Sequence, residues 1–408
     1  MNSLAPTSLR SLSFVGLCLL FVACSSSSPG GGSGSGGTSG GGSGGATAAG
    51  SGGASASGGT TGNDDAGSGS GGTVAGTGGT SPGTGGASAG TGGTMATDGG
   101  GTDAPTGADL APPGLTGTQM DPGTTGDGTI SQPGPYTNAP ETKMRVAGAP
   151  TGMQTANAYY ASKTVYPDRK FRYSIYVPAQ YQKGKRAALM VFQDARHYDG
   201  TPTDYLFNVA ITFDNLIYKG DMPVTIAVMI DPGTPSGDYR PNTTDNADYR
   251  SPEYDSSSPN YAKFLIDEFL ADVVLPNYDI VQDPDGWAVA GHSSGGSAAF
   301  AVAWNRTEKV HKVLTADASF NLIADAFPGQ VTSTTPAKPI RTYLNSGTMD
   351  MPGWMAANIG MANALIAKKY HTRFDSGVGT HDPPTGALAA FSDSLRWLWR
   401  GYKLPWYP

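Results

Sequence analysis

Short apolar runs separated by stretches of helical periodicity dominate the sequence from about residue 170 to its end. Residues 170–177 alternate polar and apolar side chains and stop at Pro178, which indicates a half-buried strand near a sheet edge. Further runs are almost entirely apolar and therefore suit strands that are buried on both faces, as in a parallel sheet. These runs are residues 187–193, 223–230, 287–290, 313–316 and 340–344.

Between these runs, apolar residues recur every three to four positions, which is the period of a helix with one buried face. The first such segment places Leu206, Val209 and Phe213 on one face. Strands that alternate with helices predict an α/β protein, whose mostly parallel central sheet carries helices on both faces. The predicted helices are residues 205–218, 261–274, 295–304, 354–367 and 388–399.

Residues 231–260 interrupt this alternation. They are rich in Pro, Gly, Asn, Asp, Ser and Tyr and show no periodic apolar pattern. A connection of this length inside a folded domain usually has a function, so we expect it to form one wall of a pocket.

Composition divides the chain into a polar first part and a globular remainder. Gly, Ser, Thr and Ala dominate residues 25–135, and 39 of the 60 glycines lie between Ser25 and Ile130. Such a segment buries too little apolar surface to offset its chain entropy. We therefore expect a disordered tether over residues 24–135 and one folded domain over residues 136–408.

Residues 1–23 have the pattern of an export signal. An apolar run over residues 13–22 follows Arg10 and is too short to span a bilayer. The run ends at Ala23-Cys24 and resembles a bacterial lipobox, which implies that Cys24 becomes the lipidated first residue of an extracytoplasmic protein anchored to a membrane, with the outer membrane favoured. The alternative is ordinary secretion after cleavage near Ala23.

Charge and cysteine content narrow the function further. The formal net charge is −7, and the sequence has no cluster of basic residues, which argues against nucleic acid as a partner. Both cysteines lie in the first 24 residues, so the expected domain has no disulfide. No cluster of Cys, His and acidic residues has metal-ligand spacing, so no metal site is expected.

The sequence Gly-His-Ser-Ser-Gly at residues 291–295 makes Ser293 the candidate nucleophile. A buried strand precedes it and a helix of small residues follows, which is the context of a nucleophile elbow. The turn forces the serine into a strained backbone conformation, so the residues two positions away must lack bulky side chains, as Gly291 and Gly295 do. The alternative is a tight glycine turn with an idle serine.

A serine hydroxyl needs a base, and the chain has five histidines. His381 follows a strand-like run and a Gly-rich loop late in the chain, so it is expected at the same sheet edge as Ser293. His311 precedes a strand and His371 starts one, so both belong at the opposite edge, whereas His197 comes early in the chain order. His381 is therefore the predicted general base, with a solvent-facing loop histidine as the alternative.

The acid of a triad in this fold comes between serine and histidine, after a strand. Asp350 follows the run at residues 340–344 and is the candidate; Asp375 is its rival, and an N-cap role for Asp350 is the alternative. For the oxyanion hole we expect the backbone N–H of Ser294 and that of Ala195, which follows an early buried strand.

Several motifs together resemble esterases related to enterochelin (ferric enterobactin) esterase. They are Val-Phe-Gln-Asp at 191–194, Arg-Ser-Pro-Glu-Tyr-Asp at 250–255, Ala-Gly-His-Ser-Ser-Gly-Gly at 290–296 and Ser-Leu-Arg-Trp-Leu-Trp-Arg at 394–400. The resemblance covers nearly all of residues 147–402 and implies the esterase-D-like branch of the α/β-hydrolases, with ester cleavage through an acyl-serine and no metal or cofactor. This sequence departs from the family pattern at Ala195, where relatives usually have Gly.

Substrate contacts are expected from His292, Arg250, Tyr254 and Trp354. Arg250 can bind an anionic group of the substrate, or it can pair with Glu253 or Asp255 and hold its loop. The sequence thus predicts an extracytoplasmic serine carboxylic ester hydrolase acting on a small-molecule or polymeric ester, such as a siderophore, a lipid, a polyester or a plant-wall ester. Alternatives are a feruloyl or acetyl carbohydrate esterase, an acyltransferase using the same triad, and a non-catalytic surface-displayed binding module.

Overall fold

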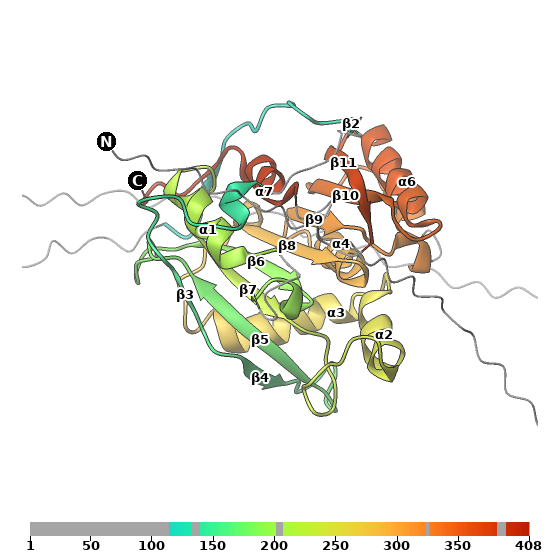
Figure 1. The fold of residues 1–408 in the computed structure, drawn as a ribbon, viewed down its shortest axis with the longest axis horizontal. Coiled ribbons are helices and arrows are strands. Elements are labelled where there is room, and N and C mark those ends of the chain that lie inside the picture. The colour runs from blue at the N-terminus through green and yellow to red at the C-terminus, as the bar shows by residue number, and fades with distance from the viewer. Residues whose placement is uncertain (1–113, 132–138, 201–206, 324–325, 382–388, 408) are drawn as a thin grey trace, which may run out of the picture. The chain divides into compact units, whose positions relative to one another are not determined.

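A ten-stranded sheet forms the centre of the structure (Figure 1), which is a computed structural model. It describes residues 114–131, 139–200, 207–323, 326–381 and 389–407. In spatial order the strands are β2 (Thr129–Ser131), β11 (His371–Thr380), β10 (Arg341–Met349), β9 (Lys312–Ala316), β8 (Trp287–His292), β6 (Ala188–Gln193), β7 (Thr225–Ile230), β5 (Lys170–Val177) and β3 (Met153–Gln154), with β4 (Ala158–Ala161) also paired to β5.

Strand directions confirm the predicted fold class. The strands from β2 to β7 are mutually parallel, whereas β5 is antiparallel to β7 and pairs with the short antiparallel strands β3 and β4. Because the carboxyl ends of parallel strands share one edge, the residues that follow β6, β8, β9, β10 and β11 gather at the same edge of the sheet. We call this the catalytic edge and the other the opposite edge.

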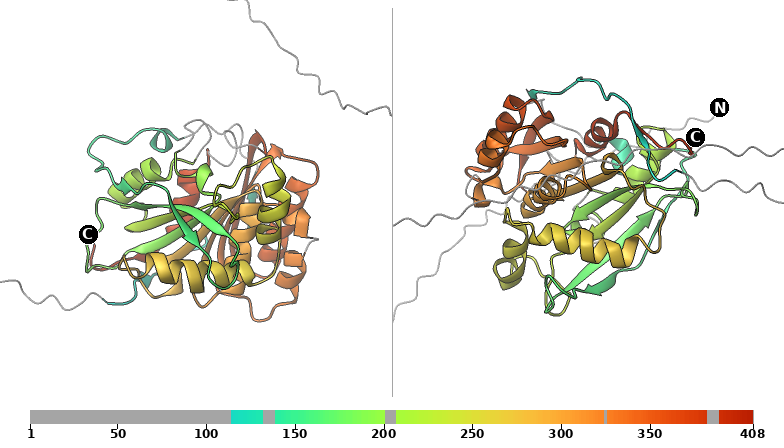
Figure 2. Two further views of the ribbon diagram at one scale, coloured as in Figure 1. Left: turned by 90° about the horizontal axis from the view of Figure 1, so that it is seen from below. Right: turned by 180° about the vertical axis from the view of Figure 1, so that it is seen from behind.

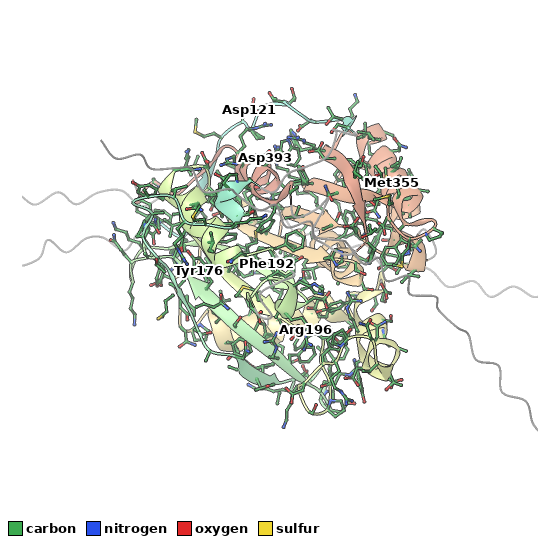
Figure 3. The ribbon with its side chains drawn as sticks, in the orientation of Figure 1. Asp121, Tyr176, Phe192, Arg196, Met355 and Asp393 are labelled. Atoms are coloured by element: carbon green, nitrogen blue, oxygen red, sulfur yellow. The ribbon has the colours of Figure 1, made fainter. Side chains whose placement is uncertain are left out.

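Burial explains why the central strands are continuous apolar runs. Every residue of β6, β7 and β8 is buried, because helices cover both faces of the sheet. Phe192 on the central strand β6 and Tyr176 on β5, nearer the sheet edge (Figure 3), are both fully buried. The alternating run of β5 is more deeply buried than expected, because its Arg172 is paired with Asp231 inside the protein.

Helices flank the sheet in two groups, one on each face (Figure 2), as the α/β pattern predicts. The predicted helix at residues 261–274 is a short α-helix that runs into a wider π-helix. One group is α1 (Val209–Tyr218), α7 (Phe391–Trp399) and the short 3-10 helix η1 (Pro140–Thr142); the other is α3 (Asn260–Lys263), η4 (Phe264–Val274), α4 (Ser294–Asn305), α5 (Ala326–Ser333) and α6 (Trp354–Ala367).

The long connection at residues 231–260 is partly helical. It contains η3 (Asn246–Arg250) and α2 (Ser251–Tyr254), and α2 packs against α4, the helix that follows Ser293. The connection therefore lies beside the candidate nucleophile. Three short 3-10 helices complete the elements: η2 (Ala195–His197), η5 (Pro284–Gly286) and η6 (Phe320–Ile323).

Residues 114–131, which we call the strap, belong to the fold rather than to the expected tether. Within the strap, β1 (Thr118–Gln119) pairs with β12 (Tyr402–Lys403), and β2 pairs with β11. Arg400 donates hydrogen bonds to the carbonyl oxygens of Gly123 (3.1 Å) and Thr125 (3.0 Å). The expected boundary at residue 135 is therefore wrong for this segment, because buried and charged partners near the C-terminus compensate for its weak apolar content.

The export signal, Cys24 and the rest of the expected tether before residue 114 lie outside the described residues. Among the helices that the structure does describe, none is long and apolar enough to cross a bilayer.

Candidate active site

Ser293 lies at the turn between β8 and α4. Its backbone has φ 60° and ψ −131°, a region that costs a non-glycine residue roughly 1–3 kcal/mol. The flanking glycines are required: a Cβ at Gly291 would lie 2.1 Å from the carbonyl oxygen of Gly295. The Ser293 amide donates to the carbonyl oxygen of Ala316 at 2.9 Å. The strained strand-to-helix turn expected from the sequence is present.

Three polar side chains that are far apart in the sequence meet at this turn. His381 follows β11, and its Nε2 lies 2.9 Å from Ser293 Oγ. Its Nδ1 lies 2.8 Å from Oδ1 of Asp350, which follows β10. A carboxylate at Nδ1 keeps the proton on that nitrogen, so Nε2 is available to accept the Ser293 hydroxyl proton. This is the arrangement of a Ser-His-Asp triad.

Asp350 is held as a carboxylate. Its side chain has no exposed surface, its Oδ1 accepts from the Met351 N–H (2.7 Å), and its Oδ2 accepts from Ser346 Oγ (3.0 Å). Burial acts to raise the pKa of Asp350, but the hydrogen bonds from His381 and Met351 outweigh it and lower the pKa below its ordinary value.

The rival residues lie elsewhere. Asp375 is within β11 and accepts hydrogen bonds from the hydroxyls of Tyr343 and Ser131. His311 directly precedes β9 and His371 begins β11, so both lie at the opposite edge, as the sequence predicted. None of these groups is placed to act on Ser293.

Sequence reasoning missed a second buried carboxyl group, Asp317, which directly follows β9 and is 2% exposed. Its Oδ1 accepts from the Gly347 N–H (2.7 Å), and its Oδ2 lies 3.7 Å from His292 Nε2. Burial and the adjacent charge of Asp350 raise the pKa of Asp317 well above its ordinary value. Its position after the apolar run at residues 313–316 was the available signal.

His292 and Trp354, both expected to contact substrate, pack against the base. His292 Nε2 donates to the backbone carbonyl oxygen of His381 (2.8 Å), and burial lowers the pKa of His292 well below its ordinary value, so the ring is neutral. The Trp354 ring meets the His381 ring edge to face, with centroids 4.3 Å apart. The two residues are 3% and 7% exposed, so in this structure they hold the imidazole in position.

The two residues expected to supply oxyanion donors lie at the same edge. Ser294 is the first residue of α4, so its N–H has no acceptor within the helix. Ala195 begins η2 after Asp194, whose φ of 67° reverses the chain at the end of β6. The two loops touch, because a Cβ at Gly295 would lie 2.7 Å from Asp194 Oδ2.

Arg250 and Tyr254 do not reach the surface, so the expectation that they contact substrate is not met in this conformation. Tyr254 has no exposed surface, and Arg250 is 7% exposed. Arg250 does hold structure, but through Asp194 (2.9 and 2.7 Å) rather than through the expected Glu253 or Asp255. Burial acts to lower the pKa of Arg250, and the carboxylate of Asp194 more than reverses this effect.

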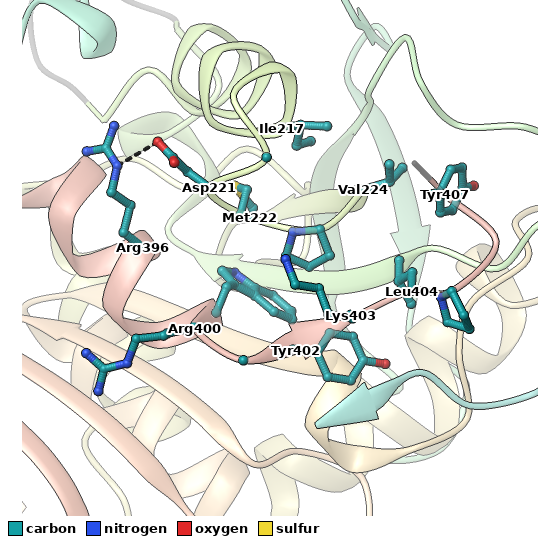
Figure 4. A pocket seen from close by; sticks show the side chains of 15 residues that line it. Ile217, Asp221, Met222, Val224, Arg396, Arg400, Tyr402, Lys403, Leu404 and Tyr407 are labelled. Carbon is teal, nitrogen blue, oxygen red and sulfur yellow. Dashed lines mark hydrogen bonds and ion pairs between the residues drawn. The ribbon is translucent and has the colours of Figure 1, made fainter. Parts of the chain in front are cut away.

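No group of three or more His, Cys, Asp or Glu residues in the described part of the chain is arranged to hold a metal ion. A cavity of about 460 Å³ lies between the start of β7 and the residues that follow α7, at the opposite edge (Figure 4). An ion pair between Arg396 and Asp221 (2.8 Å) lies at its wall. The position of this cavity separates it from the chemistry at Ser293.

Comparisons with known proteins identify the family and a similar fold. The profile of the family described as "Putative esterase" matches residues 164–382, which is more than half of the chain. No curated protein matches the sequence.

Solved structures of similar fold include three esterases. Enterochelin esterase from Shigella flexneri has 18% identity and a TM-score of 0.50, with 64% of this chain and 61% of that chain covered. A CE1 ferulic acid esterase from Anaeromyces mucronatus, solved with ferulic acid, has 16% identity, a TM-score of 0.49, and 67% and 98% coverage. Ferric enterobactin esterase from Salmonella typhimurium has 15% identity, a TM-score of 0.48, and 64% and 61% coverage. This chain therefore spans about three fifths of the two enterobactin enzymes.

Proposed function

The chain belongs to the esterase family that matches residues 164–382 and is a carboxylic ester hydrolase, and we propose that it works outside the cytoplasm through an acyl-enzyme on Ser293. The observation that carries this proposal is the contact chain from Ser293 Oγ through His381 to Asp350, with distances of 2.9 and 2.8 Å.

The reaction follows from the positions of these groups. His381 Nε2 removes the hydroxyl proton as Ser293 Oγ attacks the ester carbonyl, and Asp350 stabilises the imidazolium that forms. The N–H groups of Ser294 and Ala195 receive the negative oxygen of the tetrahedral intermediate. His381 then protonates the departing alcohol, and in the second half-reaction it activates the water that releases the acid.

The surface around the triad favours an ester with an apolar part. Met349 and Met351 flank Asp350, and Val378 lies three residues before His381; their exposed fractions are 58%, 42% and 48%. An acyl or alcohol group that covers these side chains gains roughly 25 cal/mol for each Å² of apolar surface removed from water. A plant-wall ester, a polyester, a lipid or an aromatic siderophore ester each provides such a group.

The location is part of the same proposal. We propose that Cys24 is lipidated and that the chain from Cys24 to the strap tethers the domain to a bacterial membrane. The tethered enzyme would then hydrolyse esters outside the cytoplasm. Mass spectrometry of the membrane fraction tests this: a diacylglyceryl group on Cys24 that is absent from Cys24→Ala is the expected result.

Hydrolysis of p-nitrophenyl, feruloyl and acetylated-sugar esters by the full chain tests the activity. We expect turnover of at least one class by wild type, loss of turnover in Ser293→Ala, and labelling of wild type but not of Ser293→Ala by a fluorophosphonate. Turnover by Ser293→Ala at the wild-type rate would contradict the proposed mechanism. Formation of a new ester when an alcohol is added would instead identify an acyltransferase.

A further inference from the structure

One short segment, residues 250–255, contacts the loops that carry both candidate oxyanion donors. These donors come from different places: Ala195 follows β6, and Ser294 begins α4. An oxyanion hole works only when its two N–H groups converge on one point, within a few tenths of an ångström. Something must therefore fix the two loops relative to each other.

The first contact runs through Arg250. Its Nε and Nη2 donate to Oδ1 (2.9 Å) and Oδ2 (2.7 Å) of Asp194, the residue immediately before Ala195. Both side chains are buried, and a two-pronged Arg–carboxylate pair fixes orientation as well as distance. The Arg250 Nη2 also lies 3.5 Å from the carbonyl oxygen of His292, next to the nucleophile.

The second contact runs through Asp255. Its Oδ2 accepts from Ser294 Oγ (3.0 Å), the side chain of the second donor residue. Its Oδ1 accepts from Ser319 Oγ (2.5 Å), and the Ser319 N–H donates to the carbonyl oxygen of Ser293 (3.2 Å). Hydroxyl groups, rather than a cation, are the partners of Asp255 within the described residues.

The segment between these two contacts is itself held in place. Glu253 accepts from Arg169 Nη1 (2.6 Å) and from the Gly233 N–H (3.1 Å). Tyr254 is fully buried and packs edge to face on Tyr261, with centroids 4.9 Å apart. A substrate does not reach these groups, so their role lies in positioning.

We propose that residues 250–255 form a clamp that positions the oxyanion hole, in which Arg250 acts on Ala195 through Asp194 and Asp255 acts directly on Ser294. The inference rests on the proposed function, because it assigns the clamp to the tetrahedral intermediate of that reaction. Arg250 and Asp255 are positioning residues and touch no reacting atom.

Asp255→Asn is the principal test. The amide keeps the size of the side chain but presents an NH₂ group to hydroxyls that now donate to a carboxylate. We expect kcat to fall about 10- to 100-fold, since a small misplacement of a catalytic group has effects of this size. KM should stay within about threefold, because the interaction concerns the intermediate.

Two further readouts separate positioning of the oxyanion hole from a general structural role. The rate constant for inactivation by a fluorophosphonate, whose oxygen occupies the hole in the adduct, should fall in parallel with kcat. The acid limb of the pH profile of kcat/KM should keep its wild-type midpoint, because the contacts of His381 are untouched. A shifted midpoint would show that the triad itself was disturbed and would contradict the inference.

Asp248→Asn is the matched control, because it makes the same change of charge on an exposed side chain two residues before Arg250. It should leave kcat within twofold of wild type. A folded Asp255→Asn enzyme with wild-type kcat would overturn the inference, even where Ser293→Ala shows that the proposed function is correct.

Ser294→Ala provides an independent test if Asp255→Asn does not fold. This variant keeps the backbone N–H and removes only the hydroxyl that reaches Asp255. We expect kcat to fall about 3- to 10-fold with KM unchanged, as for loss of one supporting contact. A kcat within 1.5-fold of wild type, at an unchanged thermal midpoint, would overturn the inference that the clamp positions the oxyanion hole.

Discussion

Two Asp–His pairs of the same contact distance lie at opposite edges of the sheet. At the catalytic edge, His381 Nδ1 lies 2.8 Å from Asp350; at the opposite edge, His311 Nδ1 lies 2.8 Å from Asp285. Among the hydrogen bonds of the described residues, only the histidine of the first pair also contacts a hydroxyl, that of the strained residue Ser293. An Asp–His contact therefore supports catalysis only where the fold places a nucleophile beside the histidine.

The opposite edge also holds features that are often taken as marks of an active site. Lys312 is 1% exposed, Arg341 stacks 3.7 Å above the Trp397 ring, and the 460 Å³ cavity lies there. Lys312 Nζ, however, donates to Gln119 of the strap, and so serves to fasten the chain. Buried charged groups at this edge stabilise the fold, whereas at the catalytic edge the buried carboxylate of Asp350 acts through His381 on Ser293 Oγ.

The largest expected effect separates the two Asp–His pairs. Asp350→Asn should lower kcat by about 10³- to 10⁴-fold, because the amide favours the wrong imidazole tautomer. Asp285→Asn, the same change at the opposite edge, should leave kcat within threefold. Both values come from steady-state kinetics on a p-nitrophenyl ester, with thermal midpoints as a check of folding. Equal effects of the two substitutions on kcat would contradict the conclusion that only the Asp350–His381 pair is catalytic.

Removal of the strap should affect stability rather than chemistry. A chain that begins at Tyr136 loses the hydrogen bonds of Arg400 to Gly123 and Thr125, and that of the Trp397 indole to Thr125. At about 1 kcal/mol for each of these three hydrogen bonds, the free energy of unfolding should fall by roughly 3 kcal/mol. Urea unfolding measures this change, and kcat per folded molecule should stay within threefold.

At the opposite edge, Lys312 should make the free energy of unfolding depend on pH. Burial lowers the pKa of Lys312 to about 8, whereas an unfolded lysine titrates near its ordinary value. Between these values the unfolded chain binds more protons, so the free energy of unfolding rises with pH, by about 1.4 kcal/mol per pH unit. Urea unfolding from pH 8 to 10 should show this rise in wild type relative to Lys312→Met. Parallel curves for the two proteins would show that Lys312 is not desolvated.

Ala195→Gly should have the smallest effect. Ala195 is not among the residues with positive φ, so its methyl group imposes no backbone strain. We expect kcat to stay within about threefold, because the donor is a backbone N–H that both residues possess. A rise of tenfold or more would show that the methyl group obstructs the oxyanion hole.

Much of the sheet was predictable because burial on both faces leaves an apolar run. The runs at residues 187–193 and 223–230 match β6 and β7 to within two residues. β10 and β11 extend beyond the predicted runs, because their polar and Gly-rich second halves form strands only by pairing with each other. A Cβ at Gly347, for example, would lie 2.4 Å from the carbonyl oxygen of Gly379.

The site was predictable where chain order carries the information, and not where distant partners decide it. The positions of Ser293, Asp350 and His381 follow from which residues come after strands. The partner of Arg250 did not follow, because Asp194 lies 56 residues away, whereas Glu253 and Asp255 are its neighbours in sequence. Long-range packing of this kind leaves no local pattern.

The first residues of the strap contact the sheet at the edge away from the catalytic serine. The carbonyl oxygen of Leu115 accepts from the Gln282 N–H (2.7 Å), shortly before β8, whereas Ser293 follows the far end of that strand. Six residues at about 3.3 Å each separate the two ends by roughly 20 Å. A substrate that reaches Ser293 therefore does not have to pass the first residues of the strap.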